Sequence, residues 1–189
     1  MVLRSDTADA MPRRIGWRRA VRSFRRDRKG STAVEFAMLA VPFLSLVFAI
    51  FETSMVHLSG QVLQTAVSDA SRLIMTGQAQ AAGFTGVDFK NEVCKRVKST
   101  FDCPNMLQVD VRVFPNFAAA TAPPPPIAGG KLDSTGFGFV PGGPNQIVVV
   151  RAAIEYPIVV PLIGQTMVNL ADNRLLIMAS AAFKNEPYN

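Results

Sequence analysis

The longest apolar run of the chain covers residues 36–51 and contains no charged residue. Counted from Ser31, the stretch of low polarity is 21 residues long, which makes about 31 Å of α-helix at about 1.5 Å per residue. The hydrocarbon core of a bilayer is about 30 Å thick. The pattern therefore predicts a membrane-spanning helix that contains one acidic residue, Glu35. Because a charge in lipid is costly, Glu35 is a candidate functional residue.

Beyond this run, apolar residues recur at steps of three and four as far as Ile74, the spacing of one helical face. The pattern predicts a single helix over residues 31–76, embedded in its first half and amphipathic in its second, with Gly77 as its stop. Pro42 removes one backbone hydrogen bond within the span and favours a kink there. Glu52 follows the apolar run. We expect its side chain to be solvated and to help terminate the helix.

The rest of the chain has the pattern of a small α+β unit. An amphipathic helix is expected over residues 87–99, and clean alternation predicts a half-buried strand over 107–114. Residues 146–160 and 174–185 are expected to form the central and third strands. A short helix packed against a three-stranded antiparallel sheet would bury one face of the sheet and leave the other exposed.

Two features of this unit concern individual side chains. In the first strand, we expect the polar residues on the outward face, opposite the buried apolar ones; they are Gln108, Asp110 and Arg112. Residues 115–145 carry seven Pro and six Gly, so they are expected to form a long exposed loop without a packed core. Within it, Phe137, Phe139 and Val140 either form a partner-binding patch or fold back onto the sheet.

Charge is divided sharply along the chain. Residues 1–30 hold ten Arg or Lys against three Asp, a net +7, and residues 31–189 hold ten against eleven acids, a net −1, which together give the +6 of the whole chain. A basic segment beside an apolar span faces the cytoplasm by the positive-inside rule. We therefore expect a basic cytoplasmic leader (1–30), a transmembrane plus amphipathic helix (31–76) and a periplasmic α+β domain (77–189) with the loop 115–145.

The two cysteines, Cys94 and Cys103, have eight residues between them. In an extracytoplasmic domain a disulfide is the natural interpretation, and closing so short a loop stabilises by about 2–3 kcal/mol. The alternative is a pair of reduced, partly buried thiols. A zinc site would need more ligands, and the one histidine, His57, lies on the amphipathic helix. No metal or cofactor is expected.

The sequence offers little material for an enzyme. It contains one histidine, and no nucleophile elbow, phosphate-binding loop or metal-binding cluster is recognisable. We expect no enzymatic activity and no catalytic residue. The basic tail would also suit nucleic acid, but the adjoining span already explains its charge, so no nucleic-acid partner is expected.

Residues of about 29–72 resemble a known family. The matching positions are Gly30, Ala33-Val34-Glu35-Phe36, Pro42, Glu52, Gln61, Ala66, Ala70 and Arg72. The segment resembles the N-terminal part of the TadE-like proteins, minor pilin-like components of the tight-adherence (Tad, Flp) pilus machinery. The closing residues 183–188 (FKNEPY) resemble the end of some members.

This resemblance implies cleavage by a prepilin peptidase after Gly30, which leaves Ser31 as the new N terminus and Glu35 as its fifth residue. Major Tad pilins have Glu-Tyr where this chain has Glu35-Phe36, and they are far shorter, so the resemblance points to a minor pseudopilin. It implies as partners other pilin-like subunits, the Tad assembly machinery, the prepilin peptidase and the bacterial inner membrane. Whether the protein enters the fibre or only primes it stays open.

The predicted cleavage site also has a physical rationale of its own. The bond after Gly30 lies at the cytoplasmic edge of the membrane, and Gly has no side chain to obstruct a protease. Cleavage would create an α-amino group with a pKa of about 7.7–8.0. In a stack of subunits, Glu35 of one chain would pair with the amino terminus of a neighbour. Alternatively, Glu35 lies near the headgroups without a partner.

Small residues favour the packing of such helices against each other. Ala33, Ala37 and Ala40 would let neighbouring helices approach closely. The first hypothesis is therefore a cleaved pseudopilin that takes part in pilus assembly. The second is an uncleaved, membrane-anchored periplasmic scaffold of an envelope or secretion complex.

Overall fold

The computed structural model describes residues 30–97, 102–120, 124–159 and 168–188. The basic leader, residues 1–29, lies outside the described residues. The chain divides into two compact units, Met1–Leu44 and Ser45–Asn189. The second unit therefore includes the C-terminal part of the long helix, which was expected to precede the α+β domain.

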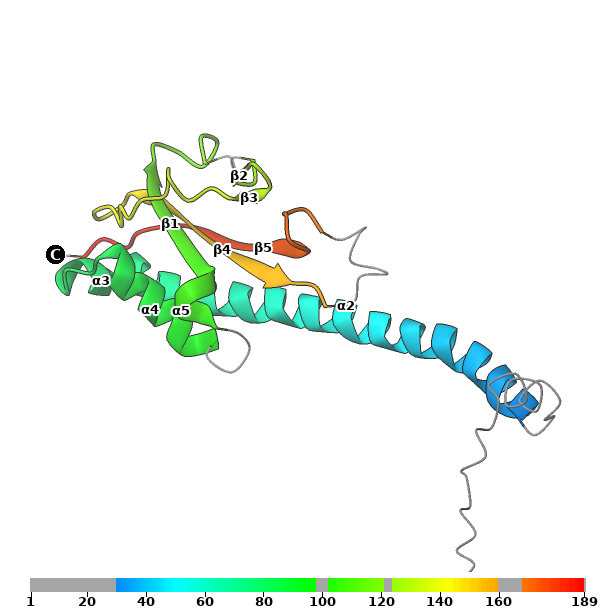
Figure 1. Cartoon of the computed structure of the whole chain (residues 1–189). Helices are drawn as coiled ribbons and strands as arrows, with labels where there is room; N and C mark the ends of the chain where they lie inside the picture. The colour runs from blue at the N-terminus through cyan, green and yellow to red at the C-terminus, as the bar shows by residue number, and fades with distance from the viewer. Residues whose placement is uncertain (1–29, 98–101, 121–123, 160–167, 189) are drawn as a thin grey trace, which may run out of the picture. The chain divides into compact units, whose positions relative to one another are not determined.

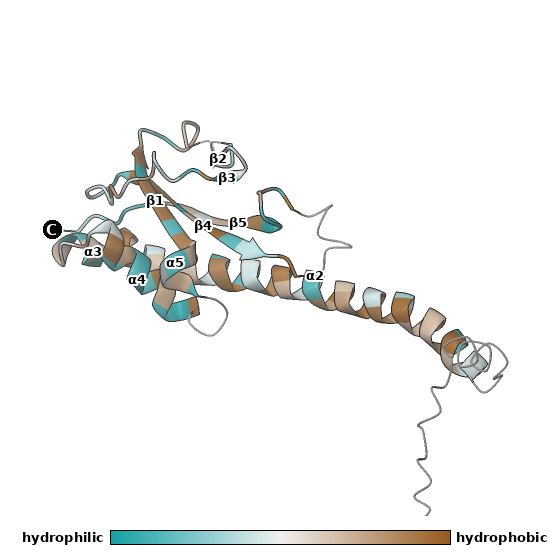
Figure 2. Ribbon diagram, viewed as in Figure 1, coloured by the Kyte–Doolittle hydropathy of each residue, from teal (hydrophilic) through white to brown (hydrophobic). Residues whose placement is uncertain are grey.

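The long helix α2 runs from Ser31 to Met75 without a break at Pro42. It confirms the expected single helix, and it ends where Gly77 adopts a positive φ of 77°. It also shows that Glu52 does not terminate a helix, because α2 continues for 23 residues beyond it, from Thr53 to Met75. Among the described residues, α2 is the one helix long and apolar enough to cross a membrane, and hydrophobic residues dominate its N-terminal half (Figure 2).

Three short helices follow: α3 (Gln78–Ala81), α4 (Gly86–Val97) and α5 (Cys103–Met106). The start of α4 is capped by a reciprocal pair, in which the Thr85 backbone N–H donates to the Asp88 carboxylate and the Asp88 N–H donates to the Thr85 hydroxyl. Its buried face is formed by Phe89, Val93, Cys94 and Val97. The expected helix is confirmed over residues 87–97, while residues 98 and 99 of the predicted range lie outside the described residues.

The main sheet has three antiparallel strands in the order β1-β4-β5 (Figure 1). Strand β1 is Leu107–Phe114, β4 is Ile147–Pro157 and β5 is Arg174–Lys184. These strands confirm the predicted mixed α+β fold, with β4 at the centre. A second, two-stranded sheet pairs β2 (Ile127–Ala128) with β3 (Lys131–Leu132).

One face of the sheet packs against the C-terminal half of α2 and against α4 (Figure 1). Apolar residues of all three elements are fully buried there, including Leu63, Val67, Ile74, Phe89, Val148, Val150 and Ile154. The helical spacing of the α2 residues and the alternate spacing of the β4 residues place them on facing surfaces. This core explains why the second compact unit begins inside α2.

The other face of the sheet is covered in part, although Ser180 and Ala182 of β5 stay exposed, and this corrects the expectation that the whole face is exposed. Ala153, Leu170 and Leu176 form a second buried cluster, and Leu132 and Phe137 pack against it. The expectation that residues 115–145 contribute no packed core is therefore wrong. Within the described part of this segment, Pro and Gly restrict regular pairing to short pieces such as β2 and β3, but they do not prevent its aliphatic and aromatic side chains from packing.

The same segment pairs with the outer edge of β1. The Val111 N–H donates to the Gly138 carbonyl at 2.8 Å, and the Val140 N–H donates to the Val111 carbonyl at 2.9 Å. The Phe139 ring lies 5.7 Å from that of Phe89. Of the two interpretations of this aromatic cluster, folding back onto the sheet is confirmed for Phe137 and Phe139, whereas the Val140 side chain is exposed.

The opposite edge of the sheet, along β5, is hydrogen-bonded to a side chain of α2. The Gln64 amide donates to the Ser180 carbonyl at 3.0 Å and accepts from the Ser180 N–H at 3.3 Å. A single glutamine of the helix thus satisfies both outward backbone groups of one residue of the edge strand.

Candidate functional site

The bond between Gly30 and Ser31 lies at the start of α2. Gly30 is exposed, and a β-carbon built at this position has no neighbouring atom within 4 Å. Ser31 is the first residue of the helix. A side chain at residue 30 meets no obstacle among the described residues, so a substitution there should not disturb the fold. Such a substitution therefore tests recognition by a protease.

Glu35 reaches back to the first residue of the helix. The Ser31 hydroxyl donates to the Glu35 carboxylate, with 2.9 Å between Oγ and Oε1. Positions i and i+4 are neighbours on a helix surface, so the spacing accounts for the contact. The carboxylate therefore lies one helical turn from the nitrogen that cleavage after Gly30 would turn into an α-amino group.

Nearly all the large apolar residues in the first half of α2 are exposed, whereas Ala49 is buried. Phe36 is 72% exposed, and Leu39 and Phe43 are similarly uncovered. A shallow apolar surface is lined by Ala33, Val34, Ala37, Met38, Val41 and Pro42. Such a surface suits lipid or another apolar helix.

Glu52 is half-buried rather than fully solvated. Its carboxylate accepts a hydrogen bond from the backbone N–H of Val159, just beyond the end of β4. This contact joins the helix to a residue 107 positions away in the sequence. No local pattern around Glu52 could have predicted the contact.

A buried ion pair lies on the sheet face that was expected to be exposed. Asp110 is 1% exposed and Arg151 is 7% exposed, and the Arg151 guanidinium donates to the Asp110 carboxylate across β1 and β4. Arg112 and the Gly138 backbone N–H also donate to Asp110, each at 3.0 Å. Sequence alternation placed Asp110 outward correctly but missed that this face is covered.

These contacts set the ionisation of Asp110. Burial acts to raise the pKa of the carboxyl, but the hydrogen bonds from Arg151, Gly138 and Arg112 outweigh it and hold the pKa below its ordinary value. Arg151 also lies over the Phe137 ring, 5.8 Å from its centroid. Because Arg112 also donates to the Gly136 carbonyl, the group fastens residues 136–138 to the sheet.

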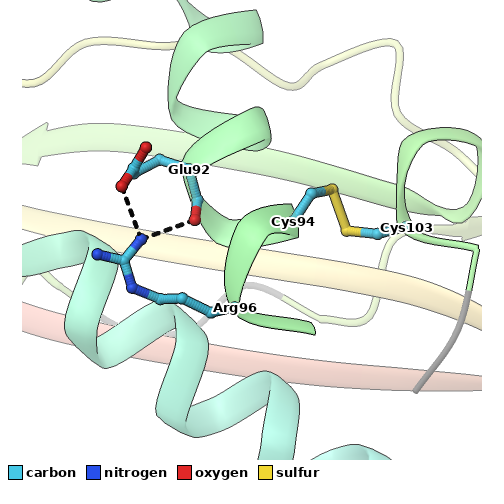
Figure 3. The surroundings of a disulfide bond; sticks show 4 residues. All are labelled: Glu92, Cys94, Arg96 and Cys103. Carbon is cyan, nitrogen blue, oxygen red and sulfur yellow. Dashed lines mark hydrogen bonds and ion pairs between the residues drawn. A yellow bond between two sulfur atoms is a disulfide. The ribbon is translucent and has the colours of Figure 1, made fainter. Parts of the chain in front are cut away.

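Cys94 and Cys103 form a disulfide, with 5.5 Å between their Cα atoms (Figure 3). It links α4 to α5 directly before β1, so the favoured pairing holds and the reduced-thiol alternative does not describe this structure. On α4, Arg96 donates to both the carbonyl and the carboxylate of Glu92 (Figure 3). Hydrogen bonding from Lys95 above all, and from Arg96, lowers the pKa of Glu92 against the effect of its partial burial.

The C-terminal residues close the fold. The buried Asn185 amide donates to the carbonyls of Pro141 and Gly143, each at 3.0 Å. The Glu186 N–H donates to the Met75 carbonyl at 2.8 Å. Residues 183–188 therefore connect the end of α2, the end of β5 and the turn before β4.

Within the described ranges, no group of three or more His, Cys, Asp or Glu side chains is placed to hold a metal ion. His57 is exposed on α2. The functional candidates are therefore the start of α2 and its exposed apolar surface.

Comparison with protein-family models agrees with this location. Residues 30–72 match the model described as TadE-like protein. The match begins at Gly30 and ends inside α2, so it includes the predicted cleavage site, Glu35 and most of the helix, but none of the sheet. Searches of curated proteins and of solved structures give no match.

Proposed function

We propose that this chain, which carries a TadE-like segment over residues 30–72, is a minor pseudopilin that takes part in assembly of a Tad-type adhesive pilus. The TadE-like family is associated with Tad pilus systems. In this proposal a prepilin peptidase cleaves after Gly30, and the mature chain begins at Ser31. The accessible Gly30 and the position of Glu35 support the cleavage step.

The observation that carries the proposal is the unequal burial of α2. Its C-terminal half supplies the core of the folded unit, with Leu63, Val67 and Ile74 fully buried. Its N-terminal half exposes nearly every apolar side chain. One half of the helix is packed in the folded unit and the other half has an exposed apolar surface. This arrangement suits a subunit that is first inserted in a membrane and then packs against the helices of other subunits.

Glu35 would provide the polar contact in that packing. After cleavage, the Ser31 nitrogen carries a positive charge one turn from the carboxylate. Within one chain the carboxylate already accepts from the Ser31 hydroxyl. We expect a neighbouring subunit to supply the ammonium group instead, because a carboxylate surrounded by apolar helices is stable only when it is paired.

The proposed topology is a single pass through the bacterial inner membrane, with the N terminus in the cytoplasm and the folded unit in the periplasm. The positive charge of residues 1–30 supports this orientation. The Cys94–Cys103 disulfide also supports it, because disulfides persist in the periplasm and are rare in the cytoplasm.

The test is the mature N terminus of protein purified from native membranes, measured by intact mass and N-terminal sequencing. The proposal expects a start at Ser31. A Gly30→Leu variant should keep its full mass, whereas Gly138→Leu, also at a position open to a side chain, should be processed normally. An intact Met1 in the natural chain would overturn the proposal and favour the anchored periplasmic scaffold.

A further inference from the structure

We propose that the folded unit makes a second contact with the bilayer, at a surface formed by Phe48 and Phe51 of α2 and Val159 at the end of β4. The inference rests on the membrane anchoring of the proposed function and adds to it. The partner is the lipid interface of the membrane that α2 crosses. Glu52 links the two parts of this surface, which we call the interfacial patch.

The level of the membrane boundary along α2 follows from the sequence. The apolar run ends at Phe51, and Glu52 is the first charged residue after Glu35. The 21 residues from Ser31 to Phe51 match the hydrocarbon thickness of about 30 Å. The outer boundary of the hydrocarbon core therefore lies close to Phe51 and Glu52.

Val159 is held at the same level. Its backbone N–H donates to the Glu52 carboxylate, and the end of β4 approaches α2 in Figure 1. The headgroup layer on each side of a bilayer is about 5–7 Å thick, and a glutamate side chain spans a comparable length. A residue hydrogen-bonded to Glu52 consequently lies within or next to this layer.

The side chain of Val159 has the exposure that a lipid contact requires. It is 80% exposed, the highest value among the large apolar residues of the described ranges, while the preceding residue, Ile158, is buried at 8%. Phe48 and Phe51 on α2 are exposed by 58% and 64%. The chain thus fixes Ile158 in the core and presents Val159 outward at the membrane boundary.

The neighbouring polar groups of the helix are satisfied without water. The Thr53 hydroxyl donates to the Ala49 carbonyl at 2.9 Å, and the Ser54 hydroxyl donates to the Ile50 carbonyl at 2.8 Å. Such bonds let hydroxyl groups lie in an apolar environment. With Glu52 accepting from Val159, the patch offers lipid an apolar surface whose nearby polar groups are paired.

This contact would fix the height of the folded unit on the membrane. A single helix can tilt in the bilayer and carry the folded unit with it, whereas a second apolar contact beside the exit point restricts that tilt. The two contacts together would hold the sheet close to the bilayer until the subunit is extracted for assembly.

The experiment places tryptophan probes in the full-length protein, reconstituted in phosphatidylcholine vesicles with brominated acyl chains. Trp17, the one natural tryptophan, is first replaced by Phe. Val159→Trp tests the patch, Phe43→Trp tests the span, and Val140→Trp is the matched control, an exposed valine beside the outer edge of β1. We expect at least a twofold loss of fluorescence for the first two probes and almost none for the third.

The outcomes separate this inference from the proposed function. Quenching of Phe43→Trp without quenching of Val159→Trp overturns the inference and leaves the anchor intact. Absence of quenching at both positions overturns the anchor as well. If Val159→Trp fails to fold, the natural chain is photolabelled instead with a phospholipid that carries a diazirine near its glycerol. We expect labelling of the peptide that contains Val159 and no labelling of the peptide that contains Val140.

Discussion

The Tyr188 ring covers Gly77 so closely that a β-carbon at residue 77 would lie 2.5 Å from Cγ of the ring. Gly77 ends the long helix with a positive φ of 77°. The last aromatic residue of the chain is therefore seated on the turn that follows α2, and the Tyr188 hydroxyl donates to the Gly142 carbonyl at 3.4 Å. This contact closes the fold at the end of α2 farthest from the predicted membrane span.

Gly77→Ala should destabilise the folded unit for two reasons. A non-glycine residue with positive φ costs about 1–2 kcal/mol, and the new methyl group would also displace Tyr188. We expect a total loss of about 2–4 kcal/mol, typical of strain combined with overpacking. Thermal unfolding of the full chain in detergent, followed by circular dichroism, measures it.

Gly83→Ala is the matched control for this experiment. Gly83 also has a positive φ, 65°, but a β-carbon there meets no atom within 4 Å. It should therefore show only the conformational cost of about 1–2 kcal/mol. Equal losses for the two variants would show that Tyr188 does not restrict Gly77.

Asp110→Ala should be strongly destabilising, because it leaves the buried Arg151 guanidinium without its counter-charge. Removing one partner of a buried pair costs about 3–5 kcal/mol. Arg112→Ala should cost far less, because Arg112 is exposed and Arg151 still pairs with Asp110. Chemical denaturation of both variants in detergent compares the two, and similar losses would contradict the central role of Arg151.

The same carboxylate predicts an acid-sensitive stability. The pKa of Asp110 in the folded chain is lowered from its ordinary value of 3.8. Its contribution to the free energy of unfolding is therefore fully present above that value and is lost as the pH falls through the lower pKa of the folded state. Thermal unfolding between pH 6 and 2 should show this loss in the natural chain, and Asp110→Asn should show a flatter profile.

Reducing the Cys94–Cys103 disulfide should lower the free energy of unfolding by about 2–3 kcal/mol, the value for a short loop. The double variant Cys94→Ser with Cys103→Ser should show the same loss and no further response to a reductant. A natural chain whose unfolding does not change on reduction would indicate that the bond does not form in the mature protein.

Under the proposed function, Glu35→Ala should leave membrane insertion intact, because the helix stays apolar, and should impair pilus assembly, because a neighbouring amino terminus would lose its proposed partner. Glu35→Gln is the sharper variant, since an amide oxygen still accepts from the Ser31 hydroxyl but carries no charge. Membrane fractionation and counts of surface pili in a complemented deletion strain measure the two effects. Normal piliation with Gln would show that charge pairing is not needed.

Much of the fold follows from local periodicity. The alternating residues 107–114 form a strand with those bounds, and Gly77 ends the long helix as predicted. Periodicity shows which side chains share a face, but not what covers that face. Asp110 was therefore assigned to an open surface. Phe137 and Leu132, from a segment whose Pro and Gly content favours a loop, pack over this face of the sheet.

The candidate site shows the same limit. Gly30, Ser31 and Glu35 lie close together in sequence, so their arrangement could be expected from helix geometry. Glu52 and Val159 are 107 residues apart, and no periodicity relates them. The packing of Tyr188 on Gly77 likewise joins residues far apart in the sequence and depends on the tertiary structure.

The two hydrogen bonds between Gln64 and Ser180 help to decide at which residue a truncated, water-soluble form of this protein should begin. A truncated chain that begins after residue 76 would lack Gln64. It would also expose to solvent the sheet face that Leu63, Val67 and Ile74 cover. Its outer strand would then have an open edge beside an apolar surface, the combination that leads to aggregation. A chain that begins near Thr53 would keep the face and the edge covered.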